Sequence, residues 1–336
     1  MKLNRIQKII LASIPPDQKK IRNFYLKYRQ GGVSTFWLIW YLDDTIFHKN
    51  TITGILSHKK ESLNYLMEIL RIAHRSMPPG IRPRLGDDSK SALSFPDTNS
   101  KVLVSLSIRS TAVHNLHISE WCWCDDDEVR ATIAADGPDS NITGETTCNG
   151  VGNDGYITYE EGKMGLNNFK SIFLPWYLQE EYAVPLNGMV VNRNSDEVAL
   201  SERVEREYNI KISDEQILFR RIKEKELKTL KPQEFPENDV EAFITSGRRF
   251  FDPRKAVVLL NEAREYAQKN PPVEQTEDYV MWEKPEQKNI YVMGADTAEG
   301  VDGDYSVLSI LNVTKRKQVF RLRIHMGIDA FFRECN

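Results

Sequence analysis

The chain has 336 residues, of which 40% are hydrophobic and 28% are charged, a composition typical of a globular protein. It contains no run of about 18 apolar residues, so we expect no membrane span. Its net charge of −3 excludes a protein that is basic throughout, so contact with nucleic acid would come from local patches such as 220–228 and 315–323. Each patch by itself is more typical of solvated surface.

The first half of the sequence predicts alternating strands and helices. Leu3, Ile6 and Ile10 share one face of a helix, which favours an amphipathic N-terminal helix over a signal peptide. Two apolar strands each lead into a helix, and a hairpin and two further strands follow. Such alternation favours an α/β fold with a mostly parallel sheet. The predicted strands are 21–28, 51–57, 91–95, 101–107, 113–119 and one within 140–149, and the predicted helices are 34–47 and 59–77.

The second half of the sequence has a different pattern. Aromatic-rich loops and charged helices extend to residue 240, with helices on both sides of 209–213. The polar, proline-punctuated stretch 269–288 has the composition of a linker. The last part has about 50 residues, too few to bury a core, so it either packs on the first domain or belongs to a longer protein. The predicted boundaries are 1–240 for the first domain, 241–288 for the linker and 289–336 for an incomplete second domain.

The four cysteines have no usual zinc-ligand spacing, and the close pair has no partner ligands nearby. We expect plain buried thiols in a reducing cytoplasm. The cysteines are Cys122, Cys124, Cys148 and Cys335.

The stretch LKYRQGGVSTF, which begins at Leu26, puts a glycine turn between a predicted strand and a predicted helix. A phosphate-binding loop, GxxxxGK[ST], occupies such a turn: backbone N–H groups wrap the phosphates, the lysine neutralises charge and the hydroxyl binds Mg²⁺. Gly32 and Ser34 match the pattern, but Lys27 stands at the first glycine and Val33 at the lysine. An ordinary turn is the commoner explanation of this stretch alone.

A nucleotide-hydrolysing site also needs an apolar strand that ends in acidic residues, one for Mg²⁺ and a glutamate that orients and deprotonates water. The segment VHNLHISE, residues 113–120, ends in Ser119 and Glu120. Ser119 stands where an aspartate is usual and offers only an uncharged hydroxyl to a metal-bound water. A solvated strand-end carboxylate explains Glu120 equally well. The missing loop charge would come from Lys27 or Arg29.

Together these segments resemble the large terminase subunit of tailed bacteriophages, the ATPase and nuclease that packages DNA. Five segments occur in the family's order and cover nearly the whole chain. They resemble, in turn, its divergent Walker A loop, its Walker B strand, its coupling motif, the segment that closes its ATPase part and the first strand of its nuclease. The segments are KYRQGGVST (27–35), LHISE (116–120), TTCNGVGNDGY (146–156), QEFPENDVEAFITSGRRFFD (233–252) and MGADTAEGVDGDYSVLSIL (293–311).

The resemblance implies a RecA/ASCE-type P-loop ATPase domain, then the start of a ribonuclease-H-like nuclease domain, with ATP and Mg²⁺ as cofactors. It implies Glu120 as the catalytic base and Arg29 as the residue that stabilises charge on the γ-phosphate. Thr147 and Asn149 would sense that phosphate, and Gln18 would contact the adenine. The implied Mg²⁺-site residues are Ser34 and Ser119, and the implied nucleotide-binding residues are Gln18, Lys27, Gln30, Gly31, Gly32, Val33, Ser34, Thr35, Thr147 and Asn149.

In the nuclease part, Asp296 lies within an apolar strand, where a carboxylate is costly unless it faces a metal or a partner. The resemblance implies Asp296 as a catalytic and metal-binding residue and Asp304 as a second ligand, around two Mg²⁺ or Mn²⁺ ions. The sequence DGD, which contains Asp302 and Asp304, is equally a turn signal. The family's later acidic residues would come beyond Cys335. We therefore expect that this chain, C-terminally truncated relative to the family, does not cleave DNA.

The resemblance also implies partners: double-stranded DNA, a portal protein and a small terminase subunit, with a homo-oligomeric ring on the capsid, in the cytoplasm of the bacterial host and away from membranes. Arg109 would reach a neighbouring subunit or form a structural salt bridge. The alternative function is a catalytically degenerate prophage remnant that retains the nucleotide-binding fold. Val33, Ser119 and the early end of the chain favour the remnant, whereas Glu120 and the coupling motif oppose it. A helicase is disfavoured because we find no second RecA-like core in the sequence.

Overall fold

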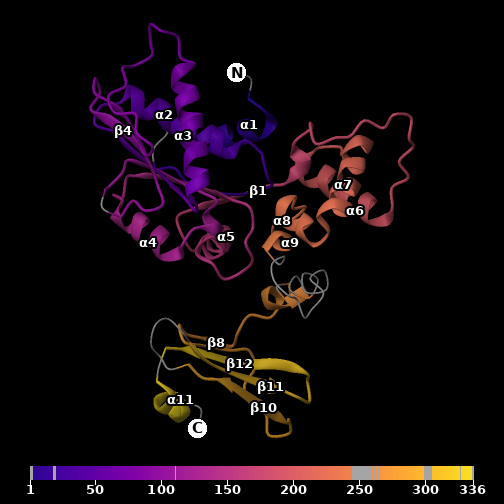
Figure 1. The fold of residues 1–336 in the computed structure, drawn as a ribbon. Coiled ribbons are helices and arrows are strands. Elements are labelled where there is room, and N and C mark those ends of the chain that lie inside the picture. The colour runs from indigo at the N-terminus through magenta and orange to yellow at the C-terminus, as the bar shows by residue number, and fades with distance from the viewer. Residues whose placement is uncertain are drawn as a thin grey trace. The chain divides into compact units, whose positions relative to one another are not determined.

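The computed structural model describes residues 3–17, 20–109, 111–243, 259, 262–263, 265–298, 305–325 and 327–334. The chain divides into two units, Met1–Arg254 and Lys255–Asn336, each with its own hydrophobic core (Figure 1). No helix within the described ranges is long and apolar enough to cross a membrane. Several residues of the sequence analysis lie outside the described residues: Gln18, Asp302, Asp304, Cys335 and the stretch 244–252 of the segment predicted to close the ATPase part.

The first unit is built on a seven-stranded sheet in the order β3-β4-β2-β5-β6-β1-β7. Neighbouring strands are parallel except the edge pair β3–β4, which is the predicted hairpin. The predicted α/β fold with a mostly parallel sheet is therefore confirmed. Because β5, β6 and β1 are adjacent and parallel, their carboxyl ends meet at one edge. The strands are β1 (Arg22–Lys27), β2 (Ile52–Ser57), β3 (Ala92–Phe95), β4 (Ser100–Ser105), β5 (Asn115–Ser119), β6 (Asn141–Thr146) and β7 (Lys170–Leu174).

Helices pack on both faces of this sheet because successive side chains of a strand point to opposite faces. On β1, Tyr25 packs with α1 and α2, whereas Phe24 and Leu26 pack on the other face with α4 and α5. α3 contacts α2 and lies over β2 and β4. These helices are α1 (Arg5–Ser13), α2 (Val33–Phe47), α3 (Lys60–Arg75), α4 (Asp126–Ala135) and α5 (Asp154–Met164).

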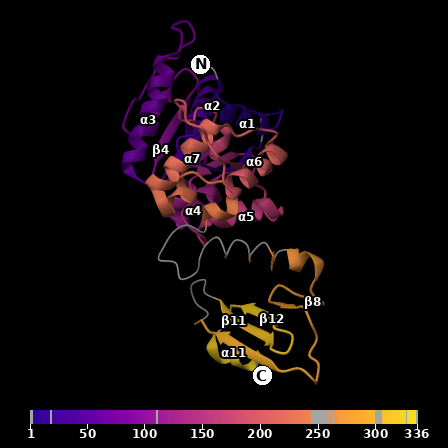
Figure 2. The same ribbon diagram turned by 90° about the vertical axis from the view of Figure 1, so that its right-hand side faces the viewer.

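After β7 the first unit continues as a helical segment, α6–α9, which lies on the viewer's side in Figure 2. α6 and α7 each begin with a capping box, Asn194 with Glu197 and Ser213 with Gln216, which satisfies backbone donors at both helix starts. The predicted helices on both sides of 209–213 are therefore confirmed. The helices are α6 (Ser195–Tyr208), α7 (Asp214–Leu227), α8 (Lys231–Glu234) and α9 (Asp239–Phe243).

Gly144 in β6 lets the indole of Trp121 pack directly on the strand. A Cβ at this position would lie 2.1 Å from Cε3 of Trp121, whose side chain is buried. We expect Gly144→Ala to lower the free energy of unfolding by about 1–3 kcal/mol, the usual cost of overpacking. Urea denaturation measures the change, with Gly137→Ala as the control, because a Cβ there would lie 3.8 Å from its nearest neighbour. Equal midpoints for the two variants would contradict the prediction.

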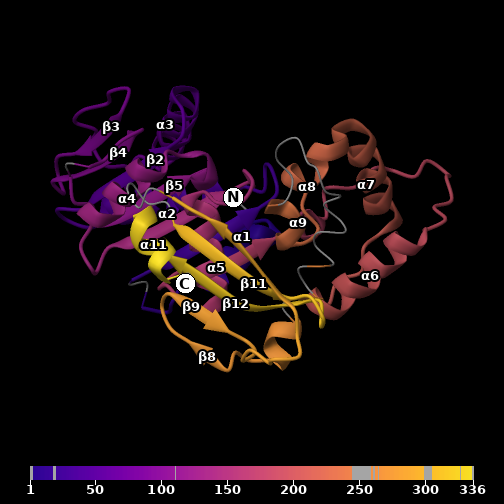
Figure 3. The ribbon, with the colours of Figure 1, turned by 90° about the horizontal axis from the view of Figure 1, so that it is seen from below.

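The second unit is a five-stranded antiparallel sheet in the order β10-β11-β12-β9-β8, seen from below in Figure 3. Leu308, Leu322 and Phe331 form its buried core. The expected strands after residue 289 are present as β10, β11 and β12. The elements are β8 (Glu274–Gln275), β9 (Tyr279–Met281), β10 (Tyr291–Asp296), β11 (Ser306–Asn312), β12 (Lys317–Ile324) and α11 (Ile328–Glu334).

The second unit differs from the sequence analysis in two respects. Asp296 is the last residue of the edge strand β10, and its side chain is exposed. Its carboxylate reaches water, so the argument that burial there demands a metal is wrong. Residues 274–281, inside the predicted linker, contain β8 and β9 of the sheet, because polar residues are tolerated on edge strands.

Candidate active site

The predicted phosphate loop connects the carboxyl end of β1 to the amino end of α2. β1 ends at Lys27 and α2 begins at Val33. Gln30 and Gly32 have left-handed backbone conformations, with φ of +63° and +78°. Within the described part of the chain, the backbone N–H groups of residues 31–35 donate to no acceptor. A helix start with free N–H donors favours an anion, so the loop has the backbone that a phosphate needs.

Two amide side chains of α1 hold this loop from the other side. Asn4 Nδ2 donates to the carbonyl oxygen of Gly31 at 3.5 Å, and Gln7 Nε2 donates to that of Gly32 at 3.3 Å. The same two residues form the capping box that starts α1. The sequence analysis predicted the helix but not this contact, although the capping pattern Asn-x-x-Gln is visible in the sequence.

Gly32 is required in this loop by its backbone conformation. A φ of +78° is unfavourable for residues with a side chain, and a Cβ would lie 3.2 Å from Gln7 Nε2. We expect Gly32→Ala to lower the free energy of unfolding by about 1–2 kcal/mol and to weaken nucleotide binding by misaligning the loop. Denaturation and nucleotide titration measure the two effects. Gly80→Ala is the control, since a Cβ there has no neighbour within 4 Å, and indistinguishable variants would refute the requirement.

A buried ion cluster lies at the carboxyl edge of the sheet, beside the loop. Lys27 Nζ lies 2.6 Å from Oε1 of Glu120 and 3.0 Å from Oε2 of Glu145. The exposed fraction of the side chain is 6% for Lys27 and 0% for Glu145. The contact to Glu120 is a hydrogen bond, whereas the contact to Glu145 is an ion pair without hydrogen-bond geometry. The structure thus brings Lys27 and Glu120 together and adds Glu145, which the sequence analysis missed.

Two hydroxyl groups complete the surroundings of Glu145. Ser34, in the first turn of α2, donates to Glu145 Oε1 at 2.7 Å, and Ser119 donates to the same oxygen at 2.9 Å. Ser119 and Glu145 are partners across the β5–β6 pair. The two residues predicted for the Mg²⁺ site therefore meet at one carboxylate oxygen.

Glu120 and the predicted coupling motif are in direct contact. Glu120 has a φ of +56°, and its side chain is 25% exposed. Its Oε2 accepts hydrogen bonds from the backbone N–H of Thr147 at 2.8 Å and from the Thr147 hydroxyl at 3.0 Å. Asn149 instead donates to the carbonyl oxygen of Cys122 at 2.9 Å, which ties the segment after β6 to the segment after β5.

The charges in the cluster are set by competition between burial and pairing. Burial lowers the pKa of Lys27, but the two carboxylates outweigh it, so the pKa is raised and the ammonium stays charged. Burial acts to raise the pKa of Glu120, but Lys27 and the bonds from Thr147 outweigh it, so the pKa is lowered. The pKa of Glu145 is raised, first by burial and also by Glu120, with Lys27 offsetting only part. Glu120 is therefore the carboxylate best suited to stay ionised.

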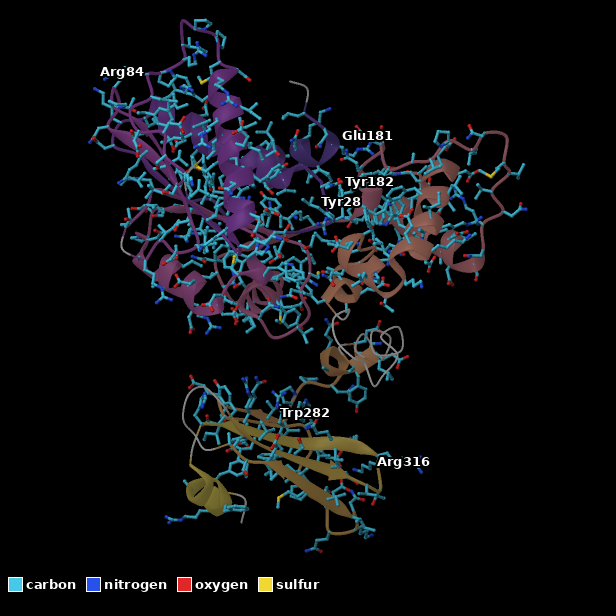
Figure 4. All side chains as sticks on the ribbon, viewed as in Figure 1. Tyr28, Arg84, Glu181, Tyr182, Trp282 and Arg316 are labelled. Carbon is cyan, nitrogen blue, oxygen red and sulfur yellow. The ribbon has the colours of Figure 1, made fainter. Side chains whose placement is uncertain are left out.

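Arg29 points away from this cluster and binds the helical segment. Its guanidinium lies 2.9 Å from Oε2 of Glu234, its side chain is 65% exposed, and its backbone N–H donates to the Glu234 carbonyl oxygen. Tyr182 donates from its hydroxyl to the carbonyl oxygen of Arg29, and its ring packs edge-on against Tyr28 (Figure 4). The helical segment thus contacts the start of the loop directly.

Other predicted residues lie elsewhere. Arg109 pairs with Glu128 at 2.6 Å, which is the structural salt bridge that the sequence analysis left open. Asp296 belongs to the second unit rather than to the sheet of the first. Within the described part of the chain, no three His, Cys, Asp or Glu side chains gather into a metal site.

Comparison with known proteins gives likenesses in structure only. Neither a protein-family model nor a curated protein sequence matches the chain. The chain is similar to solved large terminases of bacteriophages. The HK97 large terminase matches with a TM-score of 0.49 and 13% identity, over 93% of this chain and 60% of that one. The large terminase of a thermophilic bacteriophage, solved in complex with ATP-γ-S, matches with 0.46 and 11%, over 99% and 72%. The ATPase domain of the Thermus phage P74-26 large terminase matches with 0.43 and 13%, over 72% and 94%.

Proposed function

We propose that the chain is an ATP-hydrolysing motor subunit, the large subunit of a terminase, which drives double-stranded viral DNA into a capsid. One observation carries the nucleotide part: Lys27, Glu120 and Thr147 form one contact network at the sheet edge beside a helix start with free N–H groups. The order of the five terminase-like segments supports the packaging part. The chain spans 60% of the HK97 large terminase, so the activity of a whole terminase belongs to this proposal.

The phosphates of ATP would lie against residues 30–35, with charge from Lys27 in place of the usual loop lysine. Lys27 suits this role because it is charged, buried and close to the end of α2 where the phosphates bind. Arg29 would leave Glu234 to stabilise charge on the γ-phosphate. Asn149 and Thr147 would respond to that phosphate and pass its loss to the rest of the motor.

Ser34 and Ser119 would hold Mg²⁺, which supplies charge neutralisation of the phosphates when bound. The donor set fits this ion, because the two hydroxyl oxygens lie within hydrogen-bond distance of the same carboxylate oxygen. Few protein ligands are needed, since nucleotide phosphates and waters complete the coordination. Glu120 would orient and deprotonate the attacking water, and its lowered pKa keeps it ionised as a base at neutral pH.

The second unit would be the first part of a ribonuclease-H-like endonuclease domain, with Asp296 and Asp304 among its metal ligands. Cleavage of DNA would belong to the full-length protein. The partners would be DNA, a portal protein, a small terminase subunit and further copies of the chain in a ring, in the cytoplasm of the bacterial host. The DNA would be gripped by its phosphate backbone, since a motor must move along any sequence.

The proposal is tested by steady-state ATP turnover of the chain with Mg²⁺ and linear double-stranded DNA. We expect turnover that requires Mg²⁺ and disappears with EDTA. Absence of turnover together with absence of nucleotide binding would reject the motor function. The catalytically degenerate remnant remains the second candidate, because Val33 and Ser119 lack the charges usual at their positions. It predicts that wild type and Glu120→Gln are equally inactive.

A further inference from the structure

The position usually held by a magnesium-side aspartate is occupied by Ser119, which has no charge. Directly across the β5–β6 pair lies Glu145, on a different strand but at the same edge of the sheet. We propose that Glu145 supplies the carboxylate for the Mg²⁺ site, in place of the missing aspartate at Ser119. This inference rests on the proposed ATPase function, because it concerns the ion that accompanies the nucleotide.

The contacts of Glu145 support this role. One of its oxygens, Oε1, accepts hydrogen bonds from both Ser34 and Ser119, the two residues predicted to hold the ion. A cation bound at the Ser34 hydroxyl therefore has Glu145 as its neighbouring carboxylate. Carboxylate and hydroxyl oxygens are hard ligands of the kind that Mg²⁺ prefers.

The charge balance points the same way. Two carboxylates, Glu120 and Glu145, share the single ammonium of Lys27. The second oxygen of Glu145 is buried and has no hydrogen-bond donor. A fully buried carboxylate is costly without good pairing, and half a share of one lysine is poor pairing. A divalent cation beside Glu145 would supply the missing positive charge.

A purely structural explanation is that Glu145 serves only to neutralise Lys27. The chain offers a matched case, Glu237, which is buried and pairs with Arg220 at 2.8 Å and with Lys231. It lies in the helical segment, outside the proposed nucleotide site. Glu237→Gln therefore removes a buried, paired carboxylate without touching the loop or the metal site.

The test measures the affinity of a fluorescent ADP analogue, mant-ADP, in Mg²⁺ and in EDTA. For wild type we expect tighter binding in Mg²⁺. For Glu145→Gln we expect the ratio of the two dissociation constants to fall by about 10–100-fold, the usual cost of losing a group that supports a metal. The affinity in EDTA should stay equal or rise, because a negative charge near the phosphates is removed. Glu237→Gln should retain the wild-type ratio.

A second variant, Ser119→Asp with Glu145→Gln, returns a carboxylate to the position opposite. We expect it to regain the Mg²⁺ dependence, whereas a structural role of Glu145 predicts no such rescue. Thermal melts identify variants that are folded. A wild-type ratio in Glu145→Gln, or a folded double variant that stays independent of Mg²⁺, would overturn the inference alone. No binding by wild type in either condition would instead reject the proposed function, and the inference with it.

Discussion

Replacing Lys27 by methionine is expected to abolish nucleotide binding and to destabilise the first unit. Methionine keeps much of the side-chain volume and removes the charge, so the change isolates electrostatics. Glu120 and Glu145 would then face each other without a cation at the carboxyl edge of the sheet. Breaking a buried pair by removing one partner costs about 3–5 kcal/mol, because a carboxylate is left buried and unpaired. Urea denaturation and mant-ADP titration measure the two effects.

The control for Lys27→Met is Lys231→Met. Lys231 is also a buried lysine, paired with the buried Glu237, and it lies in α8. We expect it to lose comparable stability and to keep nucleotide binding. The double variant Lys27→Met with Glu145→Gln should recover part of the lost stability, since only Glu120 remains unpaired, but no nucleotide binding. If Lys27→Met binds mant-ADP like wild type, another basic residue carries the phosphates.

The sheet and its helices could be predicted from sequence because their signals are local. Apolar strands of five or six residues, helical apolar spacing and the glycine turn at Gly32 all lie within short segments. The position of Lys27 and Glu120 at strand ends followed from the same patterns. In a parallel sheet, strand ends collect at one edge, so the meeting of Lys27 with Glu120 needed only the correct class of fold.

Glu145 could not be predicted in the same way, because its role depends on strand order. Only the insertion of β6 between β5 and β1 puts Glu145 between Lys27 and Ser119. A signal was nevertheless present: Glu145 stands in a strand whose other residues are mostly apolar or small. The argument that a buried carboxylate needs a partner was applied to Asp296, which is exposed, and would have been correct for Glu145.

The contact of Arg29 with Glu234 is a second example of information absent from local patterns. The two residues are 205 positions apart in the chain, and the helical segment that brings them together follows β7, the last strand of the sheet in sequence. A basic residue beside a glycine turn is ambiguous by itself. It can meet a phosphate or an acidic partner, and only the packing of α8 against the loop shows which partner Arg29 has without nucleotide.

Replacing Glu120 by glutamine is expected to lower ATP turnover by about 10²–10⁴-fold, the contribution typical of a general base. Glutamine keeps the shape and can still accept the Thr147 bonds, so binding of mant-ADP should persist. Because the pKa of Glu120 is lowered, the base is ionised above its ordinary value. Wild-type turnover should therefore show no acidic limb from this group near neutral pH, and steady-state assays from about pH 5.5 to 8 test this.

The same cluster predicts that Glu120→Gln loses activity without losing stability. Removing one of two carboxylates leaves Lys27 and Glu145, a pair of opposite charges at 3.0 Å, so no ion is left buried alone. This is the opposite of Lys27→Met, in which two carboxylates lose the cation that they share. Glu237→Gln serves again as the control, with turnover unchanged. A Glu120→Gln variant with wild-type turnover would remove Glu120 from the chemistry. A variant as unstable as Lys27→Met would show that Glu120, rather than Glu145, is the structural partner of the lysine.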